Sequence, residues 1–274
     1  MKTPKSFGYG SKKKTAETAL VTVVIVWVCM LILMPLYGIV KEACTSGLFS
    51  GLISITRPDA LHSFYLTLML TVGAVVVNTF FGIVLAIVLV RQEFKGKLVL
   101  NGLIDLPFAV SPIVAGFMFI TLYGPYGWIG SLFEAHGVKI IYAFPGMMIA
   151  TLFVTFPFVV REVVPVLREY GMEQEEAAFV LGATKWQTFW KVTLPSIKWG
   201  LVYGITLTVA RSIGEFGAVM VVSGAIINKT QTATLFTHQQ FTNFDYGGAF
   251  AAAVVLASVS FITLVIMQYI QKRK

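Results

Sequence analysis

The stretch Phe64–Val90 reads FYLTLMLTVGAVVVNTFFGIVLAIVLV and contains no charged residue. About 20 apolar residues are enough for a helix to cross the hydrocarbon core of a bilayer. Gly73 and Gly82 lie within this run, and we expect neighbouring helices to approach closely there, because glycine lets helix backbones meet. The stretch therefore predicts a helix that spans a membrane.

The composition of the whole chain indicates the same class of protein. Hydrophobic residues make up 57% of the 274 residues, charged residues 12%, and the mean hydropathy is +0.80. A soluble domain is about one quarter charged, and a single globule would expose much of this apolar surface to water. At about 20 residues per span, the chain can hold six helices and their connections. We expect an all-α integral membrane protein with one membrane domain.

Six apolar stretches are long enough to cross a bilayer. They lie at residues 19–40, 63–90, 98–122, 140–160, 197–222 and 249–270. The third is interrupted by Pro107 and Pro112. The first is expected to be retained rather than cleaved as a signal peptide, because it is long and no small-residue cleavage site follows it. Together the stretches predict a transmembrane domain over residues 19–270, with short tails at 1–18 and 271–274.

Basic residues are unevenly distributed between the two sides of this predicted topology. With the N-terminus in the cytoplasm, 16 Lys and Arg residues lie on the inner side and four on the outer side. Connections rich in Lys and Arg stay in the cytoplasm, so both termini are expected there. This bias accounts for the net charge of +8 better than binding to nucleic acid does.

The longest hydrophilic segment on the inner side covers residues 161–196. The glutamates of Glu173–Glu176 would occupy the first turns of a short helix, where the helix dipole favours acidic side chains. Gly182 would end that helix in a left-handed conformation. Thr184 and Gln187 have the spacing of a capping box, which begins a second helix. The segment therefore predicts a helix, a tight turn and another helix.

The first of these two helices has the features of a docking element. Ala177 and Ala178 are small enough to let the backbone of another protein approach closely. The alternative is an amphipathic helix that lies on the membrane surface. The three acidic residues beside the alanines disfavour contact with anionic headgroups, so docking to a protein is the preferred interpretation.

The same segment resembles a known family. Glu176-Ala177-Ala178 followed by Gly182, Val192 and Leu194-Pro195 is similar to the EAA motif of permease subunits in bacterial ABC importers. The one departure is Val192, where the family usually has isoleucine. The resemblance implies a type I ABC importer permease with a cytoplasmic coupling helix that binds a groove in an ATPase. The coupling residues that it implies are Glu176, Ala177, Ala178, Gly182, Leu194 and Pro195.

Three further segments resemble the sulfate/thiosulfate branch of this family. They are Asp105–Pro112, Phe156–Glu162 and Arg211–Val219, the last followed by Val222–Gly224. The resemblance implies a subunit that moves sulfate or thiosulfate into the cytoplasm. Molybdate permeases share the Gly214–Gly217 stretch, so a molybdate or tungstate permease is the alternative.

The resemblance also implies the partners of the chain and its place in the cell. One coupling segment would fill one of the two grooves of a homodimeric ATPase of the CysA type, so a second permease of the CysT/CysU type would fill the other. A periplasmic sulfate/thiosulfate-binding protein would deliver the anion to the outer face. The chain would lie in the bacterial inner membrane, among its lipids.

Several ionisable and helix-breaking residues fall inside the predicted spans, where charge is costly and often functional. Arg211 and Glu215 are four residues apart and would pair on one helix face; the pair is either structural or lies on the anion path. Asp105 would pair with Arg211 or cap the helix after the proline, a structural role. Pro107 and Ser111, with Pro112 beside them, either line a cavity or only kink the helix.

Nothing in the sequence indicates an intrinsic enzyme. The chain contains no Gly-x-x-x-x-Gly-Lys-Ser/Thr, His-Glu-x-x-His or Gly-x-Ser-x-Gly. Its two cysteines form no Cys-x-x-Cys and its three histidines are far apart, so neither a metal site nor a bound cofactor is expected. ATP and Mg²⁺ would be used by the partner ATPase. A secondary transporter would not need a docking segment, and a scaffold without a transport path would tolerate changes at Arg211 and Glu215.

Overall fold

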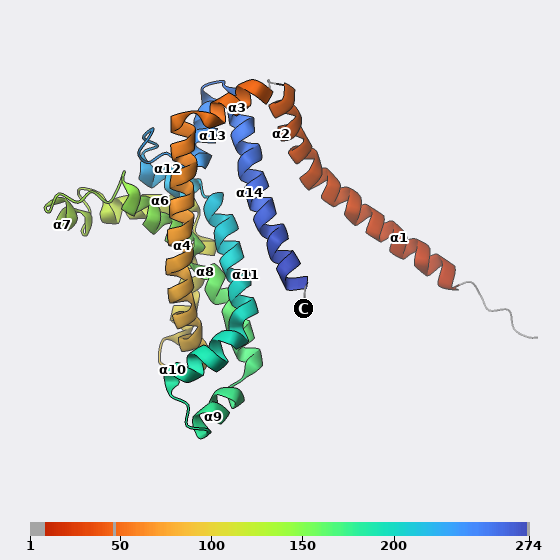
Figure 1. The fold of residues 1–274 in the computed structure, drawn as a ribbon, viewed down its shortest axis with the longest axis vertical. Helices are drawn as coiled ribbons and strands as arrows, with labels where there is room; N and C mark the ends of the chain where they lie inside the picture. Colours follow the sequence, from red (N-terminus) through yellow and green to blue (C-terminus); the bar gives the residue numbers. More distant parts are fainter. Residues whose placement is uncertain (1–8, 46–47, 273–274) are drawn as a thin grey trace, which may run out of the picture.

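A computed structural model describes residues 9–45 and 48–272 as helices and their connections, with no strand among them (Figure 1). The helices, of which η1 and η2 are π-helical, are α1 Tyr9–Val28, η1 Cys29–Leu33, α2 Met34–Thr45, α3 Leu48–Thr56, α4 Pro58–Arg91, α5 Lys97–Ala109, α6 Pro112–Tyr123, α7 Gly130–Glu134, α8 Phe144–Tyr170, α9 Glu173–Val180, α10 Lys185–Thr188, η2 Phe189–Thr193, α11 Leu194–Ile213, α12 Gly217–Ser223, α13 Ala233–Thr242 and α14 Tyr246–Lys272.

Five of the helical segments are long and apolar enough to cross a membrane on their own. The third predicted span is different: α5 and α6 together have the length and composition of a span, but they are bent by 112° where they meet. The number of spans is therefore six only if this bent pair counts as one. The break lies between Pro107 and Pro112, where the sequence predicted an interruption, and the bend is large.

Two other predicted boundaries need correction. The fifth apolar stretch is not one helix, because α11 ends at Ile213 and the chain turns before α12 begins at Gly217. The hydrophilic segment at 161–196 begins inside α8, because that helix continues to Tyr170. Apolar composition alone cannot reveal either boundary, since residues on both sides of each one are compatible with a helix.

The centre of the fold is α8, which packs between α4 and α11 (Figure 1). Val159 on α8 is fully buried. A Cβ atom added at Gly82 on α4 would lie 2.7 Å from Val159 Cγ1, and one added at Gly204 on α11 would lie 2.8 Å from Val159 Cα. Glycine on both sides therefore lets three helices pack with their backbones close together. This confirms the close contact that the sequence predicted at Gly82.

Two clusters of buried apolar side chains lie along α8. One joins its N-terminal half to α4, α12 and α13 and includes Leu66, Met147 and Val219. The other joins its C-terminal half to α4, α5 and α11 and includes Val163 and Ile197. Side chains of α8 therefore contribute to both clusters and connect them along the length of the helix.

The first span, Glu17–Thr45, has no buried residue in its most apolar window, and α1 projects away from the other helices (Figure 1). It contains η1, in which the Met34 N–H donates to the carbonyl oxygen of Cys29, five residues earlier. The predicted tails at 1–18 and 271–274 lie partly outside the described residues. Of the first tail, residues 9–18 belong to α1.

Candidate functional site

The predicted helix, turn and helix are present between α8 and α11. Helix α9 ends before Gly182, whose φ is +84°. The Gly182 N–H donates to the carbonyl oxygen of Phe179 at 2.9 Å, which closes the turn. Thr184 then forms the predicted capping box: its Oγ1 accepts from the Gln187 N–H at 3.3 Å, and its own N–H donates to Gln187 Oε1 at 2.8 Å. The local prediction is confirmed. We call residues 173–193 the coupling segment.

The structure places the six predicted coupling residues in two groups. Glu176, Ala177 and Gly182 are exposed at the tip of the coupling segment, where Ala178 is half-buried. Leu194 and Pro195 lie at the start of α11 instead, and the Leu194 side chain packs against the apolar cluster around Val163. The first group is available to a partner, whereas the second attaches the coupling segment to the membrane domain.

Sequence reasoning overlooked the most exposed side chains of this tip. Val180 is 87% exposed and Leu181 is 88% exposed, and Phe179 beside them is also exposed. Apolar side chains in water are costly unless another surface covers them. The signal was present in the sequence as an apolar run directly before Gly182. The tip therefore presents exposed apolar side chains directly after the acidic N-terminal turn of α9.

A second feature without a sequence signal holds the coupling segment in place. Glu175 on α9 accepts from Arg91 Nη2, at the end of α4, at 3.1 Å. The same Glu175 Oε1 accepts from Thr193 Oγ1 of η2 at 2.8 Å. The side chains of Arg91 and Glu175 are only 12% and 15% exposed. One carboxylate thus joins three elements on the side of the molecule where α9 and α10 lie beyond the ends of α4 and α8 (Figure 1).

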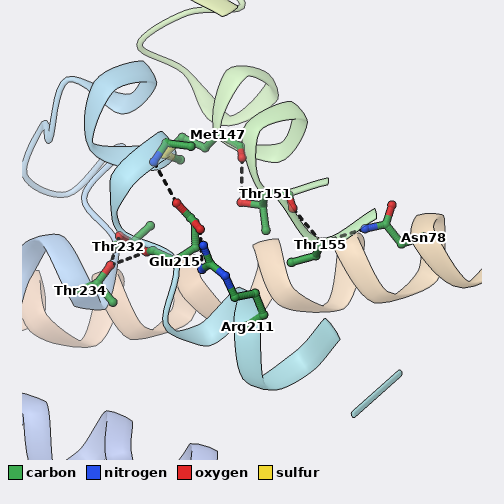
Figure 2. Close-up of polar contacts among 9 residues, drawn as sticks. Asn78, Met147, Thr151, Thr155, Arg211, Glu215, Thr232 and Thr234 are labelled. Atoms are coloured by element: carbon green, nitrogen blue, oxygen red, sulfur yellow. Dashed lines mark hydrogen bonds and ion pairs between the residues drawn. The ribbon is translucent and has the colours of Figure 1, made fainter. Parts of the chain in front are cut away.

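Arg211 and Glu215 form the predicted ion pair, at the break between α11 and α12 (Figure 2). Arg211 Nη1 lies 2.6 Å from Glu215 Oε2, and the two side chains are 32% and 1% exposed. Glu215 lies beyond the end of α11 rather than within a continuous helix. Its Oε2 makes no aligned hydrogen bond, so this contact is an attraction between charges.

The rest of Glu215 fastens the two elements that follow it. Its Oε1 accepts from the Ala218 N–H, in the first turn of α12, at 2.8 Å. Its carbonyl oxygen accepts from Thr234 Oγ1 of α13 at 2.7 Å, and Thr234 contacts Thr232 (Figure 2). Glu215 therefore fixes the geometry of the helix break whatever further role its charge has.

Asp105 does not pair with Arg211 and does not cap α6. It accepts two hydrogen bonds from Arg161 on α8, one of them from Nε at 2.6 Å, while Arg161 Nη2 also donates to the carbonyl oxygen of Asn101. Ser111 occupies the N-cap position of α6, but its side chain makes no capping hydrogen bond. Because Asp105 and Arg161 are 56 residues apart in sequence, spacing could not reveal the pair. The structure therefore gives Asp105 a partner on α8 that the sequence did not suggest.

The two interrupted helices meet in space. A Cβ atom added at Gly217, where α12 begins, would lie 3.0 Å from Pro112 Cβ, where α6 begins. Pro107 lines a pocket of about 380 Å³ between α4, α5, α6 and α8, together with apolar side chains and Asn78. Ser111 is not among the residues of that pocket. The break near Ser111 therefore adjoins the break that contains Glu215, whereas Asp105 and Pro107 belong to other surroundings.

A chain of buried polar groups connects α4 and α8 beside this site (Figure 2). Asn78 Nδ2 donates to Thr155 Oγ1 at 2.8 Å and to the carbonyl oxygen of Leu152 at 3.1 Å. Thr155 and Thr151 each donate to the carbonyl oxygen four residues earlier on α8. Since these donors are satisfied inside the protein, they stabilise helix packing and are not free to bind an anion.

Known proteins resemble this chain along most of its length. Residues 78–274 match the family described as "Binding-protein-dependent transport system inner membrane component". The chain is 44% identical over 266 residues to the sulfate transport system permease protein CysW of Synechococcus elongatus, covering 97% of this chain and 93% of that protein. It is 37% identical over 249 residues to CysT of Escherichia coli, covering 91% and 90%.

Solved structures share the fold at low sequence identity. A bacterial ABC transporter involved in the import of the acidic polysaccharide alginate contains a chain with a TM-score of 0.78, 16% identity and 96% coverage of both chains. The same transporter in complex with an alginate-bound periplasmic protein gives a TM-score of 0.80 at 16% identity, again with 96% coverage of both chains. The arrangement of helices is therefore that of the membrane subunits of such transporters.

Proposed function

This chain belongs to the binding-protein-dependent transport system inner membrane components, and on that premise we propose that it is the permease subunit of an ATP-driven importer of sulfate or thiosulfate. The observation that carries the proposal is the coupling segment, which lies within the family match and exposes apolar side chains at Phe179, Val180 and Leu181. The relatives named for sulfate transport support the choice of anion.

The coupling segment is the proposed docking site for the ATPase. Glu176, Ala177 and Ala178 would contact the ATPase groove, with Val180 and Leu181 filling its apolar part. Gly182 sets the direction in which the chain leaves α9. Closure of the ATPase around ATP and Mg²⁺ would then displace α9 as a rigid helix, and the permease itself would catalyse no reaction.

A second permease and a soluble binding protein complete the proposed transporter. One docking helix per chain fills one of the two equivalent grooves of an ATPase homodimer of the CysA type. The match to CysT supports a second, different permease as the neighbour. The alginate transporter bound to its periplasmic protein supports delivery of the anion by a binding protein on the outer face.

The proposed orientation places the coupling segment and both termini in the cytoplasm, with the chain in the bacterial inner membrane. The excess of Lys and Arg on that side supports this orientation. The connections that would face the periplasm include the segment around α7 and the segment between α12 and α13.

Within this proposal Arg211 is the residue best placed to attract the anion. The Arg211 side chain is 32% exposed, whereas the Glu215 side chain that it contacts is 1% exposed. Glu215 would lower the positive potential enough for the anion to leave again, because conduction requires weak binding. Ser111 lies at the adjoining helix break and is the second candidate for this path. Asp105 and Pro107, the other predicted candidates, lie away from this break, so their proposed part is to hold α5 against α8.

The test is uptake of labelled sulfate by a strain that lacks this chain, with and without its restoration. Restored uptake that unlabelled thiosulfate inhibits and molybdate does not is the expected result. Failure to restore sulfate uptake, together with rescue of molybdate uptake, would overturn the choice of anion and leave the importer standing. Rescue of neither would overturn the importer.

A further inference from the structure

One face of the chain combines aromatic and basic side chains in a way that docking to the ATPase does not explain. Three of the five tryptophans lie between residues 186 and 199, and Lys185, Lys191 and Lys198 lie among them. No Asp or Glu occurs between Ala177 and Gly214. This stretch is therefore positively charged, in contrast to the acidic start of α9 directly before it.

The structure gathers the aromatic rings on the outside of α10 and η2. Trp186 stacks on Phe189 with ring centroids 6.1 Å apart, and the Trp190 ring lies 5.6 Å from Trp186 and 5.5 Å from Phe189. Trp186 is 69% exposed and Trp190 is 51% exposed. The buried residues of the same two elements are Thr188 and Thr193. We call Lys185, Trp186, Phe189, Trp190 and Lys191 the aromatic–basic face.

This face lies at the level where the apolar part of α4 ends. Thr193 donates to Glu175, which is paired with Arg91, the last residue of α4. The apolar run of α4 ends at Val90, so η2 adjoins the position where a span emerges from the hydrocarbon. Tryptophan and lysine are the residues that favour this boundary, the ring among acyl chains and the amine toward headgroups.

A third lysine lies beside another tryptophan at the start of α11. The Lys198 amine lies 5.4 Å from the centroid of the Trp199 ring. An ammonium above an indole is stabilised by the ring and can still donate hydrogen bonds outward. The arrangement again presents a cation beside an aromatic surface, one residue after Ile197, which is buried in the protein.

We propose that the aromatic–basic face binds anionic phospholipid headgroups in the leaflet beside the ATPase. This goes beyond the proposed function but rests on the orientation that it assigns. The lipid holds α10 and η2 at the membrane surface, while the acidic α9, which repels the same headgroups, remains free to engage the ATPase. Opposite charge on the two sides of Gly182 thus divides the coupling segment into a part held by lipid and a part moved by protein.

The first measurement is quenching of tryptophan fluorescence by brominated phosphatidylglycerol in nanodiscs that hold the assembled transporter. The variant Trp186→Phe/Trp190→Phe keeps two apolar rings but removes the fluorophores, and we expect it to lose a large part of the quenching. Trp128→Phe, which changes an exposed tryptophan on a distant connection, is the matched control. Equal quenching in the wild type and in the Trp186/Trp190 variant would overturn the proposal.

The second measurement is the dependence of binding on anionic lipid. Each lysine near a charged membrane surface strengthens binding by roughly fivefold. Lys185→Gln/Lys191→Gln should therefore weaken binding to phosphatidylglycerol by roughly 25-fold, and Lys139→Gln/Lys229→Gln, on other connections, should not. If bound ATPase shields Trp186 and Trp190 from iodide while brominated lipid leaves them unquenched, the face belongs to the ATPase and the proposal fails. Both measurements use tryptophan fluorescence and do not depend on sulfate uptake. A failure of uptake would therefore count against the proposed function only.

Discussion

Arg91 Nη2 lies 3.1 Å from Glu175 Oε1, so the last residue of α4 is joined directly to the first turn of α9. Thr193 Oγ1 donates to the same carboxylate oxygen, so the end of η2, directly before α11, is attached as well. Through this carboxylate a force on α9 reaches α4 and α11 together, as well as α8, to which α9 is connected along the chain.

Replacing Glu175 with Gln should reduce the amount of sulfate transported per ATP hydrolysed. Hydrogen bonds to a charged group contribute about 1.5–3 kcal/mol each, and Gln keeps the shape of the side chain but not its charge. The measurement is the ratio of uptake to ATPase activity in proteoliposomes. The exchange Arg91→Glu/Glu175→Arg should recover part of the ratio.

A matched control for this change is Glu93→Gln. Glu93 pairs with Lys97 at 2.6 Å, but its side chain is solvent-exposed, and exposed pairs of this kind contribute little. If Glu93→Gln and Glu175→Gln had the same effect on the ratio, the joint between α4 and α9 would have no special part in coupling.

Replacing Gly182 with Val should uncouple ATP hydrolysis from uptake. A Cβ atom at this position would meet no atom within 4 Å, so the cost comes from the backbone: φ is +84°, and a side chain there costs roughly 1–2 kcal/mol. Gly182→Asn, which tolerates this conformation better, should retain more uptake. The measurement is again uptake per ATP.

Gly137 serves as a control that separates the effect of backbone strain from the effect of a position in the coupling segment. Its φ is +76° and a Cβ atom there would also meet nothing within 4 Å, but it lies after α7 on another connection. Gly137→Val imposes the same backbone strain outside the coupling segment. We expect it to leave uptake per ATP unchanged, and a loss equal to that of Gly182→Val would contradict the role assigned to Gly182.

Arg211→Gln should reduce assembly of the transporter. The Glu215 side chain is 1% exposed, and removing one partner of a buried ion pair costs about 3–5 kcal/mol because the other charge stays buried. The measurements are the thermal midpoint of the purified complex and the quantity of assembled complex in membranes.

The double variant Arg211→Gln/Glu215→Gln should recover assembly, because no buried charge is left unpaired and the amide oxygen can still accept from the Ala218 N–H. Uptake by this variant then reports the transport role alone: reduced uptake by a fully assembled complex would support Arg211 on the anion path. Normal assembly and normal uptake in the single variant would contradict both roles.

Gly82→Ala should destabilise the protein more than Gly73→Ala does. The new methyl group at position 82 would lie 2.7 Å from Cγ1 and 2.8 Å from Cβ of Val159, a stiff side chain that has no room to move, and overpacking of this kind costs about 1–3 kcal/mol. At position 73 it would meet the flexible end of Met148, and the better helix propensity of alanine offsets much of the contact. Thermal midpoints of the two variants check this order, and a reversed order would show that Val159 can relocate.

The parts of the structure that the sequence predicted are those determined by neighbours along the chain. The turn at Gly182 and the capping box of Thr184 depend on residues within three or four positions, and both are present. The pairing of Arg211 with Glu215 has the same origin, since four residues separate them. The fold class, an all-helical ABC importer permease, followed from the apolar stretches and the motif and is confirmed by the relatives.

The parts that the sequence did not reveal depend on contacts between distant segments. Glu175 is 84 residues from Arg91, and Asp105 is 56 residues from Arg161, so no spacing rule connects either pair. The prolines near Ser111 indicated a break, but the angle of 112° results from how α5 and α6 pack on α8 and α12. The end of α11 at Ile213 was likewise hidden, because Gly214 and the residues after it are apolar apart from Glu215.

The π-helical turn η2 connects α10 to α11 and accommodates one extra residue between the two helices. The Leu194 N–H donates to the carbonyl oxygen of Phe189 five residues earlier, so this turn holds one residue more than an α-helix would. One residue corresponds to about 100° of rotation. The π-helical turn already takes up one extra residue, so deleting a single residue between 189 and 193 would convert it into an α-helical turn and leave the Trp186 side of α10 facing nearly the same way relative to α11. Only an insertion or deletion beyond the one residue that the π-helical turn takes up would rotate the side chains of α10 relative to α11.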